Sequence, residues 1–252
     1  MNSISDTNDY KNICKLAYIN DESFNKFKSN NHYNSILEHV SKEQGELYLQ
    51  YLNVNFPQFT DKIDLFKMND IYGGTILSYY DNIGYISPST LRYIKVLSDL
   101  NSLFGSLDGK KIVEIGVGYG GQCFITNQFF SSIEYNLIDL DEVLLLSDKY
   151  LNKLNTNHKI IKIDEIDNLK DEFDIVISNY AYSEVNKDLQ DFYWEKIIKN
   201  SKNGYLTLNF ISHLFGINSY NKDELLQKFS VKNPKILEET PNTFEKNIIL
   251  YF

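Results

Sequence analysis

Three glycines and one acidic residue in the middle of the chain have the spacing of a nucleotide-binding loop. Gly116, Gly118 and Gly120 follow an apolar run at 111–115 and precede a helix-compatible segment. Glycines here allow a tight turn and leave the adjoining space free of side chains. The amides at the start of the following helix suit a negative group. Asp139 ends the next apolar run, where a carboxylate can bind both ribose hydroxyls of an adenosine moiety.

Two cofactors are compatible with this loop. Gly116, Gly118 and Gly121 satisfy the G-x-G-x-x-G pattern of NAD-binding proteins. Two features favour S-adenosylmethionine instead. Glu114 lies two residues before the first glycine, where a dinucleotide-binding fold normally has an apolar residue. The run Phe-Asp-Ile-Val-Ile-Ser-Asn-Tyr (173–180) is typical of the fourth strand of methyltransferases, whose end faces both cofactor and acceptor. We therefore predict S-adenosylmethionine as the cofactor and S-adenosylhomocysteine as the product.

Several motifs resemble those of a bacterial sugar O-methyltransferase family. They are Ile-Ser-Pro-Ser-Thr-Leu-Arg-Tyr (86–93), Val-Glu-Ile-Gly-Val-Gly-Tyr-Gly-Gly-Gln (113–122), Ile-Asp-Leu-Asp-Glu-Val (138–143), Ser-Asn-Tyr-Ala-Tyr-Ser-Glu (178–184) and Gly-Tyr-Leu-Thr-Leu-Asn-Phe (204–210). The resemblance covers residues 71–252, although the family tends to have glycine in place of Val117 and proline in place of Asp141. It implies a class I methyltransferase fold and methyl transfer to a sugar of a surface glycan, such as a capsule polysaccharide, or to its precursor.

Short apolar runs alternate with helix-compatible segments from Lys110 onward. This alternation is typical of βαβ units and a mainly parallel sheet. The expected strands cover 112–115, 135–138, 160–163, 174–177, 205–210 and 247–251, and the expected helices cover 121–130, 141–154, 187–200 and 220–229. We predict an α/β, Rossmann-like class I methyltransferase fold with a mainly parallel seven-stranded sheet flanked by helices. The last strand has no helix after it and is expected to lie antiparallel at the end of the sheet.

The segment before this alternation is expected to be mostly helical. Residues 8–56 lack proline, contain one glycine and carry apolar residues at loosely helical spacing. We predict a helical N-terminal extension or lid over 1–70 and a methyltransferase domain over 71–252, with irregular structure at 57–74. Ser87 and Pro88 predict the start of a helix that ends at Gly105.

Methyl transfer from a sulfonium is an in-line displacement, so the enzyme must hold the methyl donor near the acceptor oxygen and remove that oxygen's proton. We expect a set of loop, strand-end and helix residues to contact the cofactor. They are Arg92, Glu114, Gly116, Gly118, Tyr119, Gly120, Asp139, Leu140, Asp164, Glu165 and Asn179. For each of them, a purely structural role is the alternative.

Some of these residues have more than one expected role. Glu114 is expected near the methionine amino group or as a partner of the loop amides. Arg92, the single arginine of the chain, is expected to bind the methionine carboxylate, to pair with Glu114, or to hold a phosphate of the acceptor. Asp164 and Glu165 are alternative partners for the adenine amino group, and Tyr119 is expected to cover the cofactor.

The acceptor side is predicted from two loops that follow strands. His213 is expected to be the general base, because a neutral imidazole suits proton abstraction near pH 7. Glu184 is expected either to act directly or to orient His213. Asn179, Tyr180 and Tyr182 are expected to shape the acceptor pocket.

Composition excludes several other classes of protein. The chain has 252 residues and a formal net charge of −9, with no basic cluster that could follow a phosphate backbone. No run reaches the ~18 apolar residues of a membrane span, and Cys14 and Cys123 make no paired motif. We expect a cytoplasmic enzyme with a small-molecule acceptor and no nucleic-acid or membrane partner. A homodimer through the N-terminal helices is one possibility for its assembly.

Other functions stay open at this point. Asp139, Asp141, Glu142 and Asp164 offer oxygen ligands, but no segment has the pattern of a dedicated metal site, so we expect no metal. The same chemistry on a phosphoryl or another small oxygen acceptor, such as the phosphoramidate of a glycan precursor, would engage Arg92. An NAD-dependent oxidoreductase and a non-catalytic partner subunit with a methyltransferase fold are the remaining alternatives.

Overall fold

The structure, a computed structural model, describes residues 3–169 and 172–252. Seven of its strands form one sheet in the order β5-β4-β3-β6-β7-β9-β8. These strands are β3 (Lys111–Ile115), β4 (Glu134–Ile138), β5 (Lys159–Ile160), β6 (Ile175–Asn179), β7 (Asn203–Leu208), β8 (Lys235–Glu238) and β9 (Ile248–Tyr251). The first five run parallel, and β9 pairs antiparallel with both β7 and β8. The predicted mainly parallel seven-stranded sheet is therefore confirmed.

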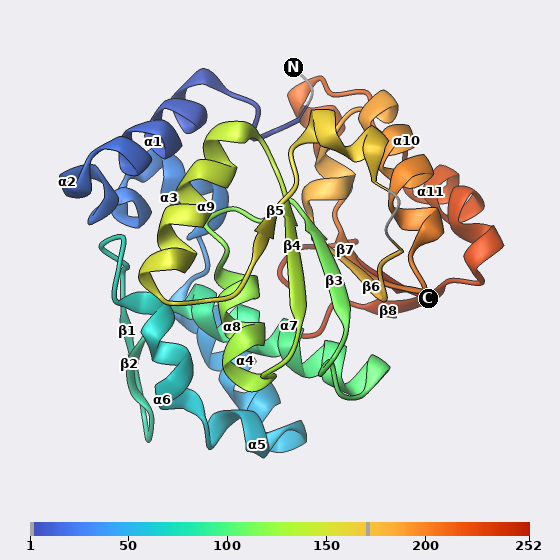
Figure 1. Ribbon diagram of the computed structural model, residues 1–252. Helices are drawn as coiled ribbons and strands as arrows, with labels where there is room; N and C mark the ends of the chain where they lie inside the picture. The colour runs from blue at the N-terminus through green and yellow to red at the C-terminus, as the bar shows by residue number, and fades with distance from the viewer. Residues whose placement is uncertain (1–2, 170–171) are drawn as a thin grey trace.

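Helices cover both faces of this sheet (Figure 1). The helices after the first 80 residues are α7 (Pro88–Phe104), α8 (Gly121–Phe129), α9 (Asp141–Lys153), α10 (Lys187–Lys196) and α11 (Lys222–Phe229). Successive side chains of a strand point to opposite faces, and β3 shows the consequence. Ile112 packs in the core that includes α7, α8 and α9, whereas Val113 and Ile115 pack in the core that includes α10 and α11.

The N-terminal segment is helical, as predicted. Its elements are α1 (Asn8–Ile19), α2 (Asp21–Phe24), α3 (Asn31–Leu37), α4 (Lys42–Asn55), α5 (Pro57–Thr60) and α6 (Ile63–Phe66). Helix α1 packs on α9 and α4 packs on α7. Cys14 of α1 and Leu52 of α4 are fully buried in the same core as Ile112 of β3. The packing of the first 70 residues is thus continuous with that of the sheet.

Several local expectations are corrected. Residues 57–74, expected to be irregular, form α5, α6 and a 3₁₀ helix at Lys67–Asp70. The small hairpin of β1 (Ser78–Tyr80) and β2 (Gly84–Ile86) and the edge strand β8 were not expected, because each is short and β8 is exposed along its whole length. Strand β9 is antiparallel as expected, but it lies between β7 and β8 instead of at the end of the sheet.

The expected boundaries of α7 are confirmed. The Ser87 hydroxyl accepts a hydrogen bond from the Ser89 amide, and Pro88 occupies the first turn. Gly105 ends the helix with φ +73°, a conformation that costs glycine little. Among the described residues no helix combines the length and apolar character that a membrane crossing requires.

Candidate functional site

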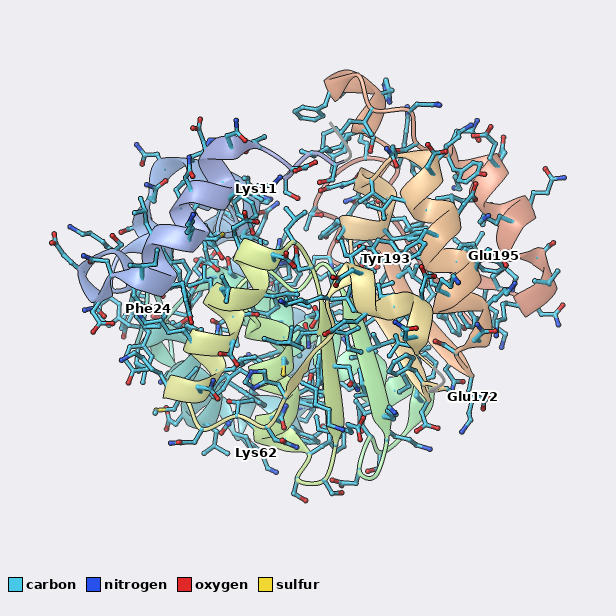
Figure 2. The ribbon with its side chains drawn as sticks, turned by 45° about the horizontal axis from the view of Figure 1, so that its top comes forward. Lys11, Phe24, Lys62, Glu172, Tyr193 and Glu195 are labelled. Carbon is cyan, nitrogen blue, oxygen red and sulfur yellow. The ribbon has the colours of Figure 1, made fainter. Side chains whose placement is uncertain are left out.

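A cavity of about 850 Å³ lies at the carboxyl ends of the parallel strands. Its wall includes the residues that follow β3, β4, β6 and β7, which is where open α/β sheets bind ligands. The N-terminal segment and the chain between β8 and β9 also contribute to this wall. Tyr193 of α10, which is labelled in Figure 2, belongs to this wall. The amide of Ile4 donates a hydrogen bond to the carbonyl of Glu184 (3.2 Å), so the start of the chain crosses the site.

The predicted glycine loop lines this cavity at two of its three glycines. Gly116 and Gly118 have φ values of +82° and +55°, which side chains other than glycine rarely adopt. A Cβ atom on Gly116 would lie 2.0 Å from the Cβ of Ala181. Gly120 does not line the cavity, and a Cβ there would meet Leu151 of α9 at 2.8 Å. The expected cofactor contact of Gly120 is therefore corrected to a packing role.

Asp139 joins the glycine loop to the end of β4. Its carboxylate accepts hydrogen bonds from the amides of Gly118 (3.1 Å) and Leu140 (2.7 Å). Burial raises the pKa of this carboxyl to about 6, and the backbone amides oppose the rise. Both Asp139 and Leu140 line the cavity, and their contact with a cofactor stays a prediction.

Glu114 lies on the wall beside the loop. It is 2% exposed, and it accepts a hydrogen bond from the Tyr135 hydroxyl (2.9 Å). Burial raises its pKa to about 8, whereas the Tyr135 hydroxyl lowers it. Asn179, at the end of β6, also lines the cavity, and its side-chain nitrogen is buried without a hydrogen-bond partner among the described residues. A buried donor of this kind normally has a partner, so this atom is suited to a ligand.

Arg92 points from α7 into the same cavity. Its guanidinium donates to the carbonyl of Leu37 (3.1 Å) and makes no ion pair within residues 3–169 and 172–252. The expected pairing with Glu114 is therefore absent. Burial raises the pKa of Tyr48 and Tyr180, and the nearby guanidinium opposes both rises. A buried charge without a carboxylate is costly, which makes Arg92 suited to an anionic group of a ligand.

Of the two expected proton acceptors, only Glu184 faces the cavity. Glu184 accepts a hydrogen bond from the side-chain nitrogen of Asn209 (2.5 Å). Burial raises the pKa of Glu184, and the Asn209 hydrogen bond and the Arg92 charge lower it. His213 lies in a 3₁₀ turn (Ser212–Phe215) that exposes its side chain to solvent, and it is not part of the cavity wall. The prediction that His213 is the general base is therefore corrected.

Two expected tyrosine contacts lie in the protein interior. Tyr182 is fully buried, and its hydroxyl donates to the carbonyl of Gln190 (3.2 Å), away from the cavity. Tyr119 is 1% exposed and accepts a hydrogen bond from the Asn69 side chain (3.1 Å). Neither residue is part of the cavity wall. The local sequence could not distinguish these tyrosines from Tyr180, which does line it.

The expected adenine contacts are also corrected. Asp164 and Glu165 lie in a 3₁₀ helix (Ile163–Asn168) and are exposed. Glu165 accepts a hydrogen bond from the amide of Lys162 (3.0 Å), closing the start of that helix. Of this segment only Ile163 lines the cavity, so its contribution to a ligand site is apolar.

Sequence reasoning missed a polar cluster in the chain between β8 and β9. Glu239 accepts hydrogen bonds from the Tyr180 hydroxyl, the Thr243 amide (3.0 Å) and the Asn247 side chain (2.9 Å). Tyr48 of α4 lines the same cavity. No motif marks these residues, because they come together only when the first and last parts of the chain pack on the sheet.

The described residues contain no group of three or more His, Cys, Asp or Glu side chains placed to hold a metal ion. The four acidic residues considered from the sequence are spread along the ends of β4 and β5, and of these only Asp139 lines the cavity. Metal independence stays a prediction.

No family model matches the chain, and no curated protein matches it in sequence. Among solved structures, the PH0226 protein of Pyrococcus horikoshii OT3 is similar with a TM-score of 0.51 and 14% identity, over 69% of this chain and 93% of that one. Magnesium protoporphyrin IX methyltransferase of Synechocystis PCC 6803, solved with bound S-adenosylhomocysteine, gives a TM-score of 0.49 and 13% identity over 64% and 80%.

The pyocyanin biosynthetic protein PhzM gives a TM-score of 0.47 and 11% identity over 65% of this chain. The match spans only 56% of the length of PhzM. At these identities the likeness concerns the fold alone. The likeness to the PH0226 protein, together with the order of the strands and the single antiparallel strand β9, shows that this chain has a Rossmann-like α/β fold.

Proposed function

We propose that this chain is an S-adenosylmethionine-dependent O-methyltransferase. Its acceptor is a small molecule, a sugar or sugar nucleotide used for a surface glycan, and the reaction takes place in the cytoplasm. One observation carries this proposal: the Asp139 carboxylate and the open backbone of Gly116 and Gly118 face one cavity at the carboxyl ends of β3 and β4. In this arrangement the carboxylate suits the ribose hydroxyls of an adenosine, and the glycine loop lets the adenosine approach the protein backbone closely.

The residues present fit the cofactor. Asp139 would take the ribose hydroxyls, and the unpartnered Asn179 nitrogen and Glu114 would lie toward the methionine part. Arg92 would take the methionine carboxylate, since its guanidinium has no carboxylate partner among the described residues. When bound, the cofactor supplies an electrophilic methyl group on a sulfonium sulfur.

Glu184 is the best-placed general base. It lines the cavity, and a carboxylate with a raised pKa takes a proton from a hydroxyl more readily than an ordinary one. The hydrogen bond from Asn209 fixes its orientation. Cofactor and acceptor together would displace water from the cavity, which would leave the acceptor oxygen as the nucleophile next to Glu184.

The topology of the sheet favours this cofactor over NAD. Dinucleotide-binding folds typically have six parallel strands in the order 3-2-1-4-5-6. Here the antiparallel strand β9 lies between β7 and the edge strand β8. Glu114, which a dinucleotide fold would replace with an apolar residue, lines the cavity.

The size of the cavity supports a small acceptor. A volume of about 850 Å³ falls within the ~300–1,000 Å³ of ordinary small-molecule sites. The resemblance of five motifs to sugar O-methyltransferases supports a sugar hydroxyl as the methylated group.

Calorimetric titration with S-adenosylhomocysteine, and with NAD in parallel, tests the proposal. We expect the first to bind in the micromolar range and NAD not to bind. Asp139→Ala and Gly118→Val should each abolish that binding. The first substitution removes the carboxylate that binds the ribose. The second places a side chain in the loop, where even a Cβ atom would lie 2.8 Å from Leu37. Glu184→Gln is the matched control and should retain it.

The opposite pattern would refute the proposal. NAD binding alone would identify an oxidoreductase, and binding of neither compound would favour a non-catalytic subunit. Undiminished affinity in the Asp139→Ala variant would show that the loop at the ends of β3 and β4 does not hold the cofactor.

A further inference from the structure

A cluster of polar side chains lines the cavity from the side of the β8–β9 chain. Glu239 is 5% exposed, and one of its oxygens accepts hydrogen bonds from the amide and hydroxyl of Thr243 (3.0 and 2.6 Å) and from Asn247 (2.9 Å). Its other oxygen accepts from the Tyr180 hydroxyl. These bonds hold the carboxylate in one orientation on the cavity wall. We call this cluster, together with Tyr48, the distal wall.

Two atoms of the distal wall are buried without a partner. They are the Tyr48 hydroxyl and the side-chain oxygen of Asn247, and both residues line the cavity. Tyr48 is 2% exposed, so water does not satisfy its hydroxyl from outside the cavity. Leaving a buried polar atom unsatisfied costs ~1–3 kcal/mol. A ligand with polar groups would remove this cost.

The backbone of Tyr180 is strained where it supports this wall. Its φ is +67°, a conformation that bulky residues rarely adopt. Its amide donates to the carbonyl of Thr207 (2.8 Å), and its hydroxyl donates to Glu239, so both ends of the residue are fixed. Strain of this kind persists where the surrounding structure imposes it, and it is concentrated at functional sites.

The charges of the cavity limit what the distal wall can bind. The lysine and arginine that line the described part of the cavity are Lys95 and Arg92. Lys95 is already paired with Asp99 at 2.6 Å, and Arg92 is assigned above to the methionine carboxylate. Arg92 lies near Tyr48 and Tyr180 of the distal wall, but in the proposed function the methionine carboxylate already pairs with it. With both cations engaged, a phosphate or carboxylate of the acceptor beside Glu239 would be uncompensated, which is unfavourable in a buried site. Neutral hydroxyl groups, in contrast, donate to carboxylates and amide oxygens and accept from phenols.

We infer that Tyr48, Glu239 and Asn247 form the acceptor subsite, and that this subsite selects a neutral ring carrying several hydroxyl groups and rejects an anionic one. Glu239 and the Asn247 oxygen accept hydrogen bonds from the hydroxyls of the acceptor, and the Tyr48 hydroxyl donates a hydrogen bond to one of its oxygens. The inference rests on the proposed function, because the acceptor must enter the cavity that holds the cofactor.

The probes that test it are neutral sugars and their charged counterparts. The protein is saturated with S-adenosylhomocysteine and titrated with the methyl glycosides of glucose, galactose, mannose and N-acetylglucosamine, and with the matching 6-phosphates. Binding is followed by saturation-transfer NMR and calorimetry. We expect at least one neutral glycoside to bind, and its 6-phosphate to bind at least about tenfold more weakly.

Two variants and a control connect this selectivity to the distal wall. Tyr48→Phe and Glu239→Gln should each weaken binding of the neutral glycoside about five- to tenfold, with the affinity for S-adenosylhomocysteine unchanged. Tyr33→Phe removes a hydroxyl that is also buried without a partner but lies on α3, outside the cavity wall, and should change neither affinity. Because the Tyr48 hydroxyl is buried without a protein partner, Tyr48→Phe should keep or raise the thermal unfolding midpoint of the unliganded protein, which separates ligand binding from a structural role.

The outcomes are distinguishable from those of the cofactor test. If S-adenosylhomocysteine binds but no neutral glycoside does, the acceptor subsite is wrong and the cofactor site stands. Tighter binding of a 6-phosphate, or unchanged glycoside affinity in both Tyr48→Phe and Glu239→Gln, would also overturn the inference. If the unmodified protein does not bind S-adenosylhomocysteine, the proposed function itself is refuted.

Discussion

The carboxyl groups around the cavity differ in how tightly they hold a proton. Burial raises the pKa of Asp139 to about 6 and that of Glu114 to about 8. At pH 7 Asp139 is therefore mostly ionised and able to accept hydrogen bonds from two hydroxyls, whereas Glu114 is mostly neutral and able to donate one. Two acids near the carboxyl ends of the neighbouring strands β3 and β4 thus differ in their protonation state.

This difference predicts how cofactor binding depends on pH. Acidification below pH 6 protonates Asp139 and removes an acceptor for the ribose hydroxyls, so affinity for S-adenosylhomocysteine should fall as pH decreases. One pH unit below the pKa, the loss should be about tenfold. Calorimetry between pH 5 and pH 8 measures it.

The matched control for that prediction is Asp139→Asn. The amide does not titrate, so its weaker binding should be flat between pH 5 and pH 7, a range in which Glu114 is already mostly neutral. An affinity of the unmodified protein that is constant from pH 8 to pH 5, or a variant that keeps the full pH dependence, would show that another group titrates with the cofactor.

At the scale of elements, one buried lysine joins the N-terminal segment to the rest of the fold. The Lys28 ammonium donates to the carbonyl of Asn69 (2.8 Å) and to the Tyr150 hydroxyl of α9 (3.0 Å). It also lies 4.0 Å from the centre of the Tyr119 ring, which belongs to the glycine loop. A cation over an aromatic face is attracted to it. Tyr119, expected at the cofactor, instead connects the loop to this lysine.

Lys28 makes a prediction about stability and pH. Burial lowers its pKa to about 8, whereas an unfolded chain keeps a lysine pKa of ~10.4. Between these two values the folded state binds fewer protons than the unfolded state, so the free energy of unfolding should rise with pH from about 8 to about 10. The rise due to this group should be at most about 3 kcal/mol.

Lys28→Met isolates that contribution. Methionine fills a similar volume but does not titrate, so the variant should lack this part of the rise in denaturant unfolding experiments at pH 8, 9 and 10. Parallel pH profiles for the variant and the unmodified protein would show that Lys28 has an ordinary pKa in the folded state.

At the scale of the whole molecule, the N-terminal helices and the sheet share one core. Buried residues of α1 and α4 belong to the same cluster as those of α7, α8 and α9, and Figure 1 shows α1 beside α9. The N-terminal segment also covers the glycine loop, where Leu37 approaches Gly118. The described residues of this segment, 3–70, therefore complete the cavity as well as the core.

This arrangement predicts that the chain unfolds as one unit. Scanning calorimetry of the full chain should show a single transition with equal calorimetric and van't Hoff enthalpies. A fragment of residues 71–252 should lose that transition, because it exposes the apolar surface that α1 and α4 cover. Two separate transitions, or a fragment that unfolds cooperatively near the midpoint of the full chain, would instead support an independent extension.

The cofactor side of the site was predictable because its residues lie close together in the sequence. Gly116, Gly118 and Asp139 follow two strands that pair in parallel, and the ends of such strands meet at one edge of the sheet. Local patterns also predicted α7 between Ser87 and Gly105. The NAD and S-adenosylmethionine alternatives could be weighed from Glu114 before the fold was known.

The sequence by itself therefore determined the parallel sheet, the glycine loop and the acid beside it, because periodicity and turn chemistry act over a few residues. Only the tertiary structure decided which side chains face the cavity. It turned His213 outward, placed Tyr182 in the core, and brought Tyr48 and Glu239 to one wall from opposite parts of the chain. Long-range packing makes these choices, since the direction of a side chain in a loop depends on whatever the rest of the chain lays against it.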